Sequence, residues 1–121
     1  MMFYFRTAIA YVELLRPLNG LIAFGSVFLG AIFASGSFVS STLIVAVSAF
    51  LVLSAGNTIN DFCDYRIDAI NKPSRPIPSG YVRRQHALGL SLVLLLMGLS
   101  LGVLTGNIYA IIIVTIVSIT L

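Results

Sequence analysis

Two long stretches of this sequence contain no charged residue, and they limit its possible folds more than any other feature. They run from Pro17 to Ile59 and from Ala87 to Leu121. Because one membrane-spanning helix needs about 20 mostly apolar residues, the first stretch could form two spans and the second nearly two. With 59% hydrophobic and only 9% charged residues, the chain also lacks the polar surface of a soluble domain.

Short turns and one polar segment divide the chain into predicted membrane spans. The uncharged turns lie at 34–38 and 105–107, and the polar segment covers residues 61–86. The predicted spans cover approximately residues 8–34, 40–60, 87–104 and 108–121. Pro17 is expected to kink or restart the helix within the first of them. We therefore predict an all-α fold, a multi-pass transmembrane helical bundle.

The basic residues predict how the chain is oriented in the membrane. The net charge is +3, and five of the seven Lys and Arg residues lie in the 61–86 segment, with the other two near the N-terminus. By the positive-inside rule, the N-terminus and the 61–86 segment are cytoplasmic and the two short turns lie outside. The single cysteine, Cys63, excludes an internal disulfide and a cysteine-based zinc site.

Three of the four acidic residues, Asp61, Asp64 and Asp68, fall within eight positions. On one continuous helix, these carboxylates and Asn60 would share a single stripe. Mutual repulsion and the helix dipole at the C-terminal end of a span both disfavour such a stripe unless a cation relieves it. The oxygen-rich composition suits Mg2+, which binds through carboxylates and substrate phosphates. The alternative is that the three acids are solvated loop residues.

Basic residues follow the acidic motif directly. Lys72 and Arg75 lie where they could join Mg2+ in a clamp on a diphosphate, and Mg2+ would assist the departure of such a leaving group. Arg83 and Arg84 flank the next span and are better interpreted as topology determinants, and His86 is interpreted as incidental.

A few polar residues lie within or beside the first two predicted spans. Arg16 is either an interface anchor or a ligand contact. Asn19 and Asn57 lie in apolar surroundings, where an amide needs a hydrogen-bond partner. That partner could be another helix or a ligand, and the sequence leaves both alternatives open.

The block from Ser54 to Gly80 resembles the first signature of the UbiA superfamily of intramembrane prenyltransferases. It contains an NDxxDxxxD motif and a following RPxxxG-type segment, and Leu14-Leu-Arg-Pro-Leu-Asn19 is similar to the first helix of that family. The resemblance implies a fold of about nine transmembrane helices around a central cavity, of which about four are present in residues 1–121. It also implies two Asp-rich motifs on opposite sides of a Mg2+-diphosphate.

The resemblance assigns roles to the polar residues. It implies that Asn60, Asp64 and Asp68 are catalytic and that Asp61, Asp64 and Asp68 bind the metal. The candidate substrate-binding residues are Lys72, Arg75, Arg16, Asn19 and Asn57. The sequence ends at Leu121, before a second Asp-rich motif, so we expect residues 1–121 to be the N-terminal part of a UbiA-type domain, carrying one half of a two-part site.

Within this family, the chain is most similar to the geranylgeranylglycerol-phosphate geranylgeranyltransferases of archaeal ether-lipid synthesis. The similarity implies an enzyme of the cell membrane that transfers a geranylgeranyl group from an allylic diphosphate to geranylgeranylglyceryl phosphate, with Mg2+ as cofactor. The expected partners are the lipid bilayer, the polyprenyl diphosphate and the lipid acceptor, and no nucleic acid. Two alternatives are a quinone or chlorophyll-type acceptor and a truncated, non-catalytic membrane protein.

Overall fold

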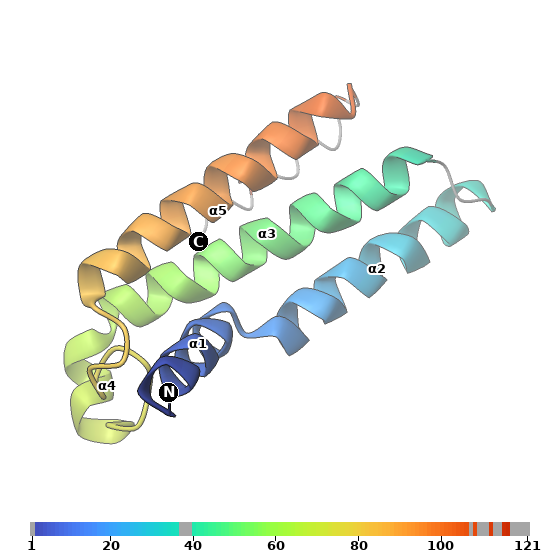
Figure 1. Ribbon diagram of the computed structural model, residues 1–121. Coiled ribbons are helices and arrows are strands. Elements are labelled where there is room, and N and C mark those ends of the chain that lie inside the picture. Colours follow the sequence, from blue (N-terminus) through green and yellow to red (C-terminus); the bar gives the residue numbers. More distant parts are fainter. Residues whose placement is uncertain (1, 37–39, 107, 109–111, 113–114, 117–121) are drawn as a thin grey trace.

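The computed structural model describes residues 2–36, 40–106, 108, 112 and 115–116, and all the regular elements in that part of the chain are α-helices. They are α1 (Met2–Leu15), α2 (Pro17–Ser35), α3 (Ser40–Cys63), α4 (Tyr65–Asn71) and α5 (Arg84–Leu104). The long helix α3 lies between α2 and α5, and α1 and α4 gather at one end of the bundle (Figure 1). The predicted all-α bundle is confirmed.

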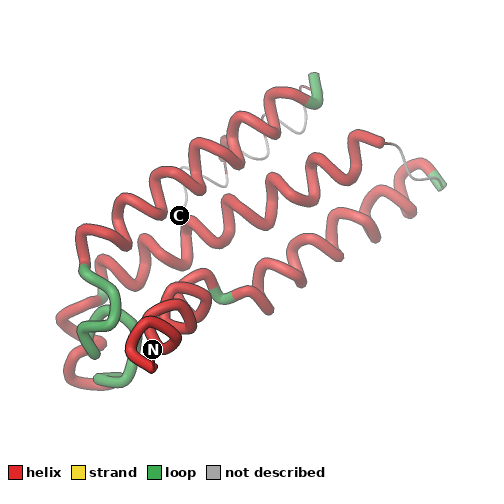
Figure 2. The backbone as a smooth tube through the Cα atoms, viewed as in Figure 1, coloured by secondary structure: helices red, strands yellow, loops and turns green. Residues whose placement is uncertain are grey.

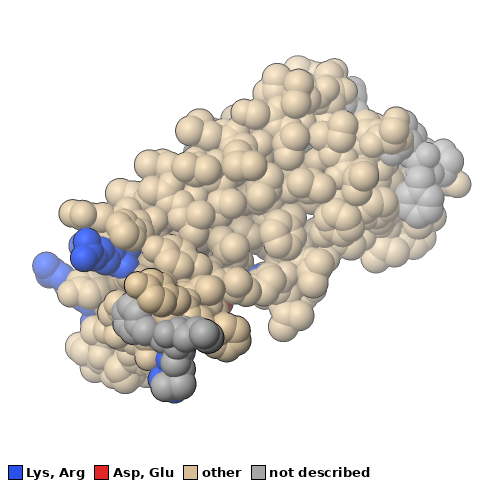
Figure 3. Space-filling view, in the orientation of Figure 1, with Lys and Arg blue, Asp and Glu red and all other residues tan. Residues whose placement is uncertain are grey.

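Three of these helices are long and apolar enough to cross a membrane. They cover Pro17–Ala34, Ser40–Cys63 and Arg84–Leu104. On the face shown in Figure 3, the visible Lys and Arg side chains are confined to the end that carries α1 and α4, and the rest of the bundle is uncharged. This separation of an apolar body from a charged end is typical of a multi-pass membrane protein.

The predicted first span, residues 8–34, is two helices rather than one. Arg16 separates α1 from α2 in a left-handed conformation, with φ 49° and ψ 65°. Pro17 then begins α2, where its missing N–H is harmless and its fixed φ already suits a helix. The restart expected at Pro17 is present, and only α2 is long and apolar enough to span the bilayer.

The polar 61–86 segment also differs from a simple loop. α3 continues to Cys63, and the short helix α4 occupies part of the remainder. Figure 2 shows the irregular stretch that follows α4, which passes beside α1 before α5 begins. Gly80 adopts a positive φ of 80° there, a conformation that favours glycine. The predicted fourth span, 108–121, lies mostly outside the described residues.

α3 and α5 approach closely because small residues lie between them. The Ser48 hydroxyl donates a hydrogen bond to the Gly98 carbonyl at 2.7 Å. A Cβ atom at Gly98 would lie 2.7 Å from Val52 Cγ2 and 3.2 Å from the backbone of α3, so only glycine fits at this distance. Small residues at helix crossings are typical of membrane bundles, in which close packing holds helices together.

A small apolar core fixes the charged end of the molecule. Ala10 and Leu14 of α1 pack with Ile77 and Val82 of the irregular stretch and with Ala87 of α5, and all five are buried. The Val82 N–H donates to the Pro76 carbonyl at 3.0 Å, which closes the turn between them. This core holds α1 and the 72–83 stretch in place beside the end of α3.

Candidate functional site

Two acidic and two basic side chains form an ion-pair cluster where α1, α3 and the irregular stretch meet. Arg16 Nη2 lies 2.5 Å from Asp61 Oδ1. Arg75 Nη1 lies 3.3 Å from the same Asp61 oxygen and also contacts Asp68 Oδ2. We call these four residues the Asp–Arg cluster.

Each member of the cluster is positioned by a local feature of the chain. The left-handed turn at Arg16 directs its side chain to the end of α3, which provides Asp61. Asp68 lies in α4, and its carbonyl accepts the Lys72 N–H at 2.8 Å. The chain then turns so that the Arg75 N–H reaches the Lys72 carbonyl at 3.0 Å, and this turn brings Arg75 back over the acids.

The cluster balances its own charge in a largely buried place. The Asp61 and Asp68 side chains are only 6% and 8% exposed, whereas Arg16 and Arg75 are 31% and 24% exposed. Removing carboxylates from water is costly unless cations and hydrogen bonds compensate them. The sequence led us to expect that a metal ion compensates the negative charge of these carboxylates. In this structure, Arg16 and Arg75 compensate the charge of Asp61 and Asp68.

The remaining motif residues lie differently from the expected stripe. Asp64, with φ −80° and ψ 2°, interrupts the helix between α3 and α4, although its N–H still donates to the Asn60 carbonyl at 2.9 Å. Asn60 and Asp61 therefore lie in α3 and Asp68 lies in α4, with Asp64 at the junction, so the motif is not on one continuous helix. Asp64 is half-buried and Asn60 is exposed.

The donor set of this region fits Mg2+ in its chemistry. All the candidate ligands offer oxygen, and Asp61 and Asp68 already converge on one nitrogen of Arg75. Mg2+ characteristically takes one or two carboxylates and completes its shell with water and substrate phosphates. Within the described part of the chain, no three Asp, Glu, His or Cys side chains come close enough to hold a metal ion by themselves. A metal held here would therefore depend on substrate oxygens.

The other predicted site residues are not all part of the cluster. Lys72 and Asn19 are exposed and lie outside it. Asn57 lies on α3, one turn from Asp61, and its Nδ2 atom is buried without a hydrogen-bond partner, as is the hydroxyl oxygen of Ser54. An unpaired buried amide is costly, so these two atoms mark a place where a ligand could supply the missing contact.

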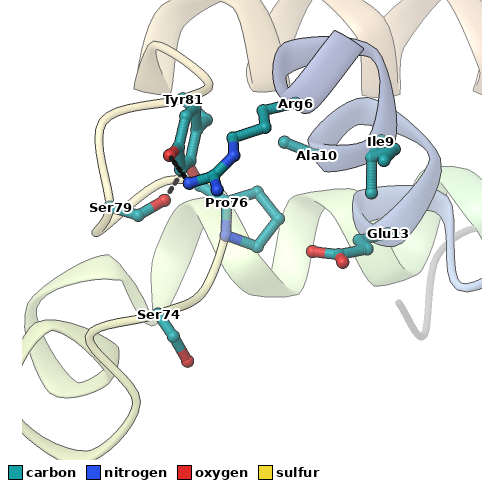
Figure 4. A pocket seen from close by; sticks show the side chains of 8 residues that line it. All are labelled: Arg6, Ile9, Ala10, Glu13, Ser74, Pro76, Ser79 and Tyr81. Carbon is teal, nitrogen blue, oxygen red and sulfur yellow. Dashed lines mark hydrogen bonds between the residues drawn. The ribbon is translucent and has the colours of Figure 1, made fainter. Parts of the chain in front are cut away.

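A second polar region lies beside the cluster, and sequence reasoning missed it. Figure 4 shows a pocket of about 200 Å³ between α1 and the irregular stretch, with Arg6 directed at Tyr81 and Glu13 on the other side. Arg6 Nη1 donates to the Tyr81 hydroxyl at 3.3 Å, and this contact raises the pKa of Arg6 above its ordinary value. The partners are 75 positions apart, so no local pattern could have revealed the pair.

Arg84 has a structural contact in addition to its predicted effect on topology. Its guanidinium lies 4.2 Å from the centre of the Phe62 ring and 5.3 Å from that of Tyr65. Its Nε donates to the Phe62 carbonyl at 3.2 Å. These cation–π contacts attach the start of α5 to the junction of α3 and α4.

Comparison with known proteins agrees with this architecture. A model of the UbiA prenyltransferase family matches residues 23–121, and the chain therefore belongs to that family. Two similar proteins are the digeranylgeranylglyceryl phosphate synthases of Methanosphaera stadtmanae and Methanothermobacter thermautotrophicus. The first is 45% identical over 92 residues, which cover 76% of this chain and 34% of the relative. The second is 46% identical over 100 residues, which cover 79% and 35%.

A solved structure has the same arrangement of helices. It is described as giving structural and mechanistic insights into digeranylgeranylglyceryl phosphate synthase in membranes. It matches with a TM-score of 0.88 and 39% identity, over 94% of this chain and 41% of that one. The chain spans about a third of the length of the curated relatives that it matches.

Proposed function

We propose that this protein transfers a geranylgeranyl group from an allylic diphosphate to the glycerol hydroxyl of geranylgeranylglyceryl phosphate, forming an ether. The family membership and the names of the relatives support a prenyltransferase of archaeal ether-lipid synthesis. The observation that carries the proposal is the Asp–Arg cluster, which concentrates two carboxylates and two guanidinium groups at one end of an apolar bundle.

The position of the cluster suits an amphipathic donor. A polyprenyl diphosphate has a long apolar tail and a highly charged head, and the two parts need different surroundings. The apolar helices α2, α3 and α5 can receive the tail, while Arg16, Arg75 and Lys72 supply donors to the diphosphate oxygens. Asn57 can add its unpaired buried Nδ2 as a further donor. Asn19, exposed near the start of α2, would contact the donor from that helix.

Mg2+ is the proposed cofactor. Asp61, Asp64 and Asp68 would hold it, with Asn60 beside them. When bound, the ion neutralises the diphosphate and assists its departure. Arg75, which contacts both Asp61 and Asp68 in this structure, would be available to a diphosphate when Mg2+ compensates the two carboxylates in its place.

The proposed site faces the cytoplasm from within the cell membrane. All Lys and Arg residues lie in the N-terminal 16 residues or in the 61–86 segment, which meet at one end of the bundle. The positive-inside rule favours a cytoplasmic location for that end.

Two acid substitutions test the proposed site. Membranes that contain the full-length protein are given labelled geranylgeranyl diphosphate, geranylgeranylglyceryl phosphate and Mg2+. Asp64→Ala and Asp68→Ala should each lower transfer by at least about 100-fold, because the charge on the departing diphosphate is no longer compensated. Arg66→Gln is the matched control, since Arg66 lies in α4, is exposed and forms no ion pair among the described residues.

Three outcomes of this assay separate the alternatives. Transfer that persists in both Asp variants would refute the site, provided that their helical content matches the native protein. Transfer in the absence of Mg2+ would refute the proposal that Mg2+ is the cofactor. If transfer requires both acids but occurs only with a quinone or chlorophyll-type acceptor, the site is retained and the proposed acceptor is wrong.

A further inference from the structure

A second pocket, of about 550 Å³, opens between α1 and the start of α5. It is lined by Thr7, Tyr11, Gly80, Tyr81, Arg83 and His86. It shares Tyr81 with the pocket of Figure 4 but contains no member of the Asp–Arg cluster. Every lining residue except Gly80 has a polar group on its side chain, so this pocket is built for a polar ligand.

The charges around this second pocket favour an anion. Arg83 is exposed and forms no ion pair among the described residues, and none of the lining residues is acidic. Two of the four acids of the chain, Asp61 and Asp68, are already paired with Arg16 and Arg75. The pocket of Figure 4, by contrast, is lined by Glu13 as well as Arg6, so it is a poorer place for a negative ligand.

His86 can add a directed hydrogen bond. The Tyr11 hydroxyl lies 3.1 Å from His86 Nδ1. When Nδ1 accepts a hydrogen bond from the Tyr11 hydroxyl, the neutral ring carries its hydrogen on Nε2, which can then donate to a ligand. The contact with Tyr11 also fixes the ring, so that Arg83 and His86 form a prepared pair of donors at the start of α5.

α1 indicates the depth of this pocket in the membrane. Tyr4, Phe5, Ile9 and Val12 are exposed by 79%, 67%, 42% and 54%, respectively, although α1 has only 14 residues and is not among the helices able to span a bilayer. A short helix with exposed aromatic and aliphatic side chains is suited to the membrane interface, at the level of lipid head groups. The pocket that α1 helps to line is therefore at that level.

From these observations we propose that the pocket formed by Tyr11, Arg83 and His86 binds the phosphate group of a membrane lipid. Arginine is suited to phosphate because its planar guanidinium presents several donors together. The site is distinct from the Asp–Arg cluster and takes a different phosphate group from that of the allylic donor. The phosphate belongs either to a lipid phosphomonoester, as in the proposed acceptor, or to a phosphodiester lipid of the bilayer.

Native mass spectrometry of the full-length protein with three lipids of identical hydrocarbon chains tests this proposal. The lipids are phosphatidic acid, phosphatidylglycerol and diacylglycerol, presented without donor or Mg2+, so the result does not depend on catalysis. A lipid carrying phosphate should be retained at least about tenfold more than diacylglycerol, and Arg83→Gln should abolish most of that preference. Arg83→Lys should keep part of it, because the positive charge remains.

The source of the phosphate and the specificity of the effect follow from the same spectra. Preference for phosphatidic acid identifies a phosphomonoester site, and equal retention of phosphatidylglycerol identifies a bilayer phosphodiester. Arg66→Gln, which removes the same charge from an exposed position in α4, should bind as the native protein does. Equal retention of diacylglycerol, or unchanged binding in both Arg83→Gln and His86→Gln, would overturn the proposal.

Discussion

Arg75 is the residue on which the Asp–Arg cluster depends most, because one of its nitrogens contacts both buried carboxylates. Arg75→Ala would leave Asp68 without an ion-pair partner and Asp61 with Arg16 alone. Since breaking a buried pair by removing one partner is strongly destabilising, the free energy of unfolding should fall by about 3 kcal/mol. Unfolding titrations in mixed micelles with sodium dodecyl sulfate measure this change.

A matched pair of variants makes the Arg75 prediction specific. Arg66→Ala removes the same charge from an exposed position and should change the free energy of unfolding by less than about 0.5 kcal/mol. Adding Asp68→Asn to Arg75→Ala should recover part of the loss, because the unpaired buried charge is gone. Equal stability of the Arg75 and Arg66 variants would mean that the cluster contributes nothing to the fold.

Among the helices, Gly98 allows the close approach of α3 and α5. Gly98→Ala should destabilise the bundle by about 1–3 kcal/mol, because its Cβ would meet Val52 and the α3 backbone and push the helices apart. Gly89→Ala, on the same helix, meets nothing within 4 Å and should be neutral or slightly stabilising. The same micelle titration compares the two, and equal losses would contradict the close approach.

The orientation of the whole molecule can be read from its single cysteine. Cys63 is exposed at the charged end of α3. If that end faces the cytoplasm, a membrane-impermeant maleimide should label Cys63 in inside-out vesicles and not in intact cells. A Cys63→Ser/Ser40→Cys variant places the thiol at the opposite end of the same helix and should show the reverse pattern. Labelling of Cys63 from outside would invert the proposed topology.

Much of the fold follows from composition and local pattern. The uncharged stretches predicted the membrane-spanning helices, because a bilayer admits only long apolar helices or closed barrels. Pro17 predicted the helix restart, since its ring and missing N–H act locally. The sequence did not predict the helix break at Asp64, between α3 and α4, because that break depends on the backbone angles of a residue that also occurs within helices.

The sequence by itself therefore determined the helical membrane class, the acidic motif and its resemblance to the UbiA family, all of which reside in consecutive residues. Tertiary structure alone decided which charges meet. Arg16 and Asp61 are 45 positions apart, and Tyr11 and His86 are 75 apart. Such contacts require α1 to pack on the 72–83 stretch and on α5. This packing places the charge-balanced Asp–Arg cluster and the pocket lined by Tyr11, Arg83 and His86 at the same end of the molecule.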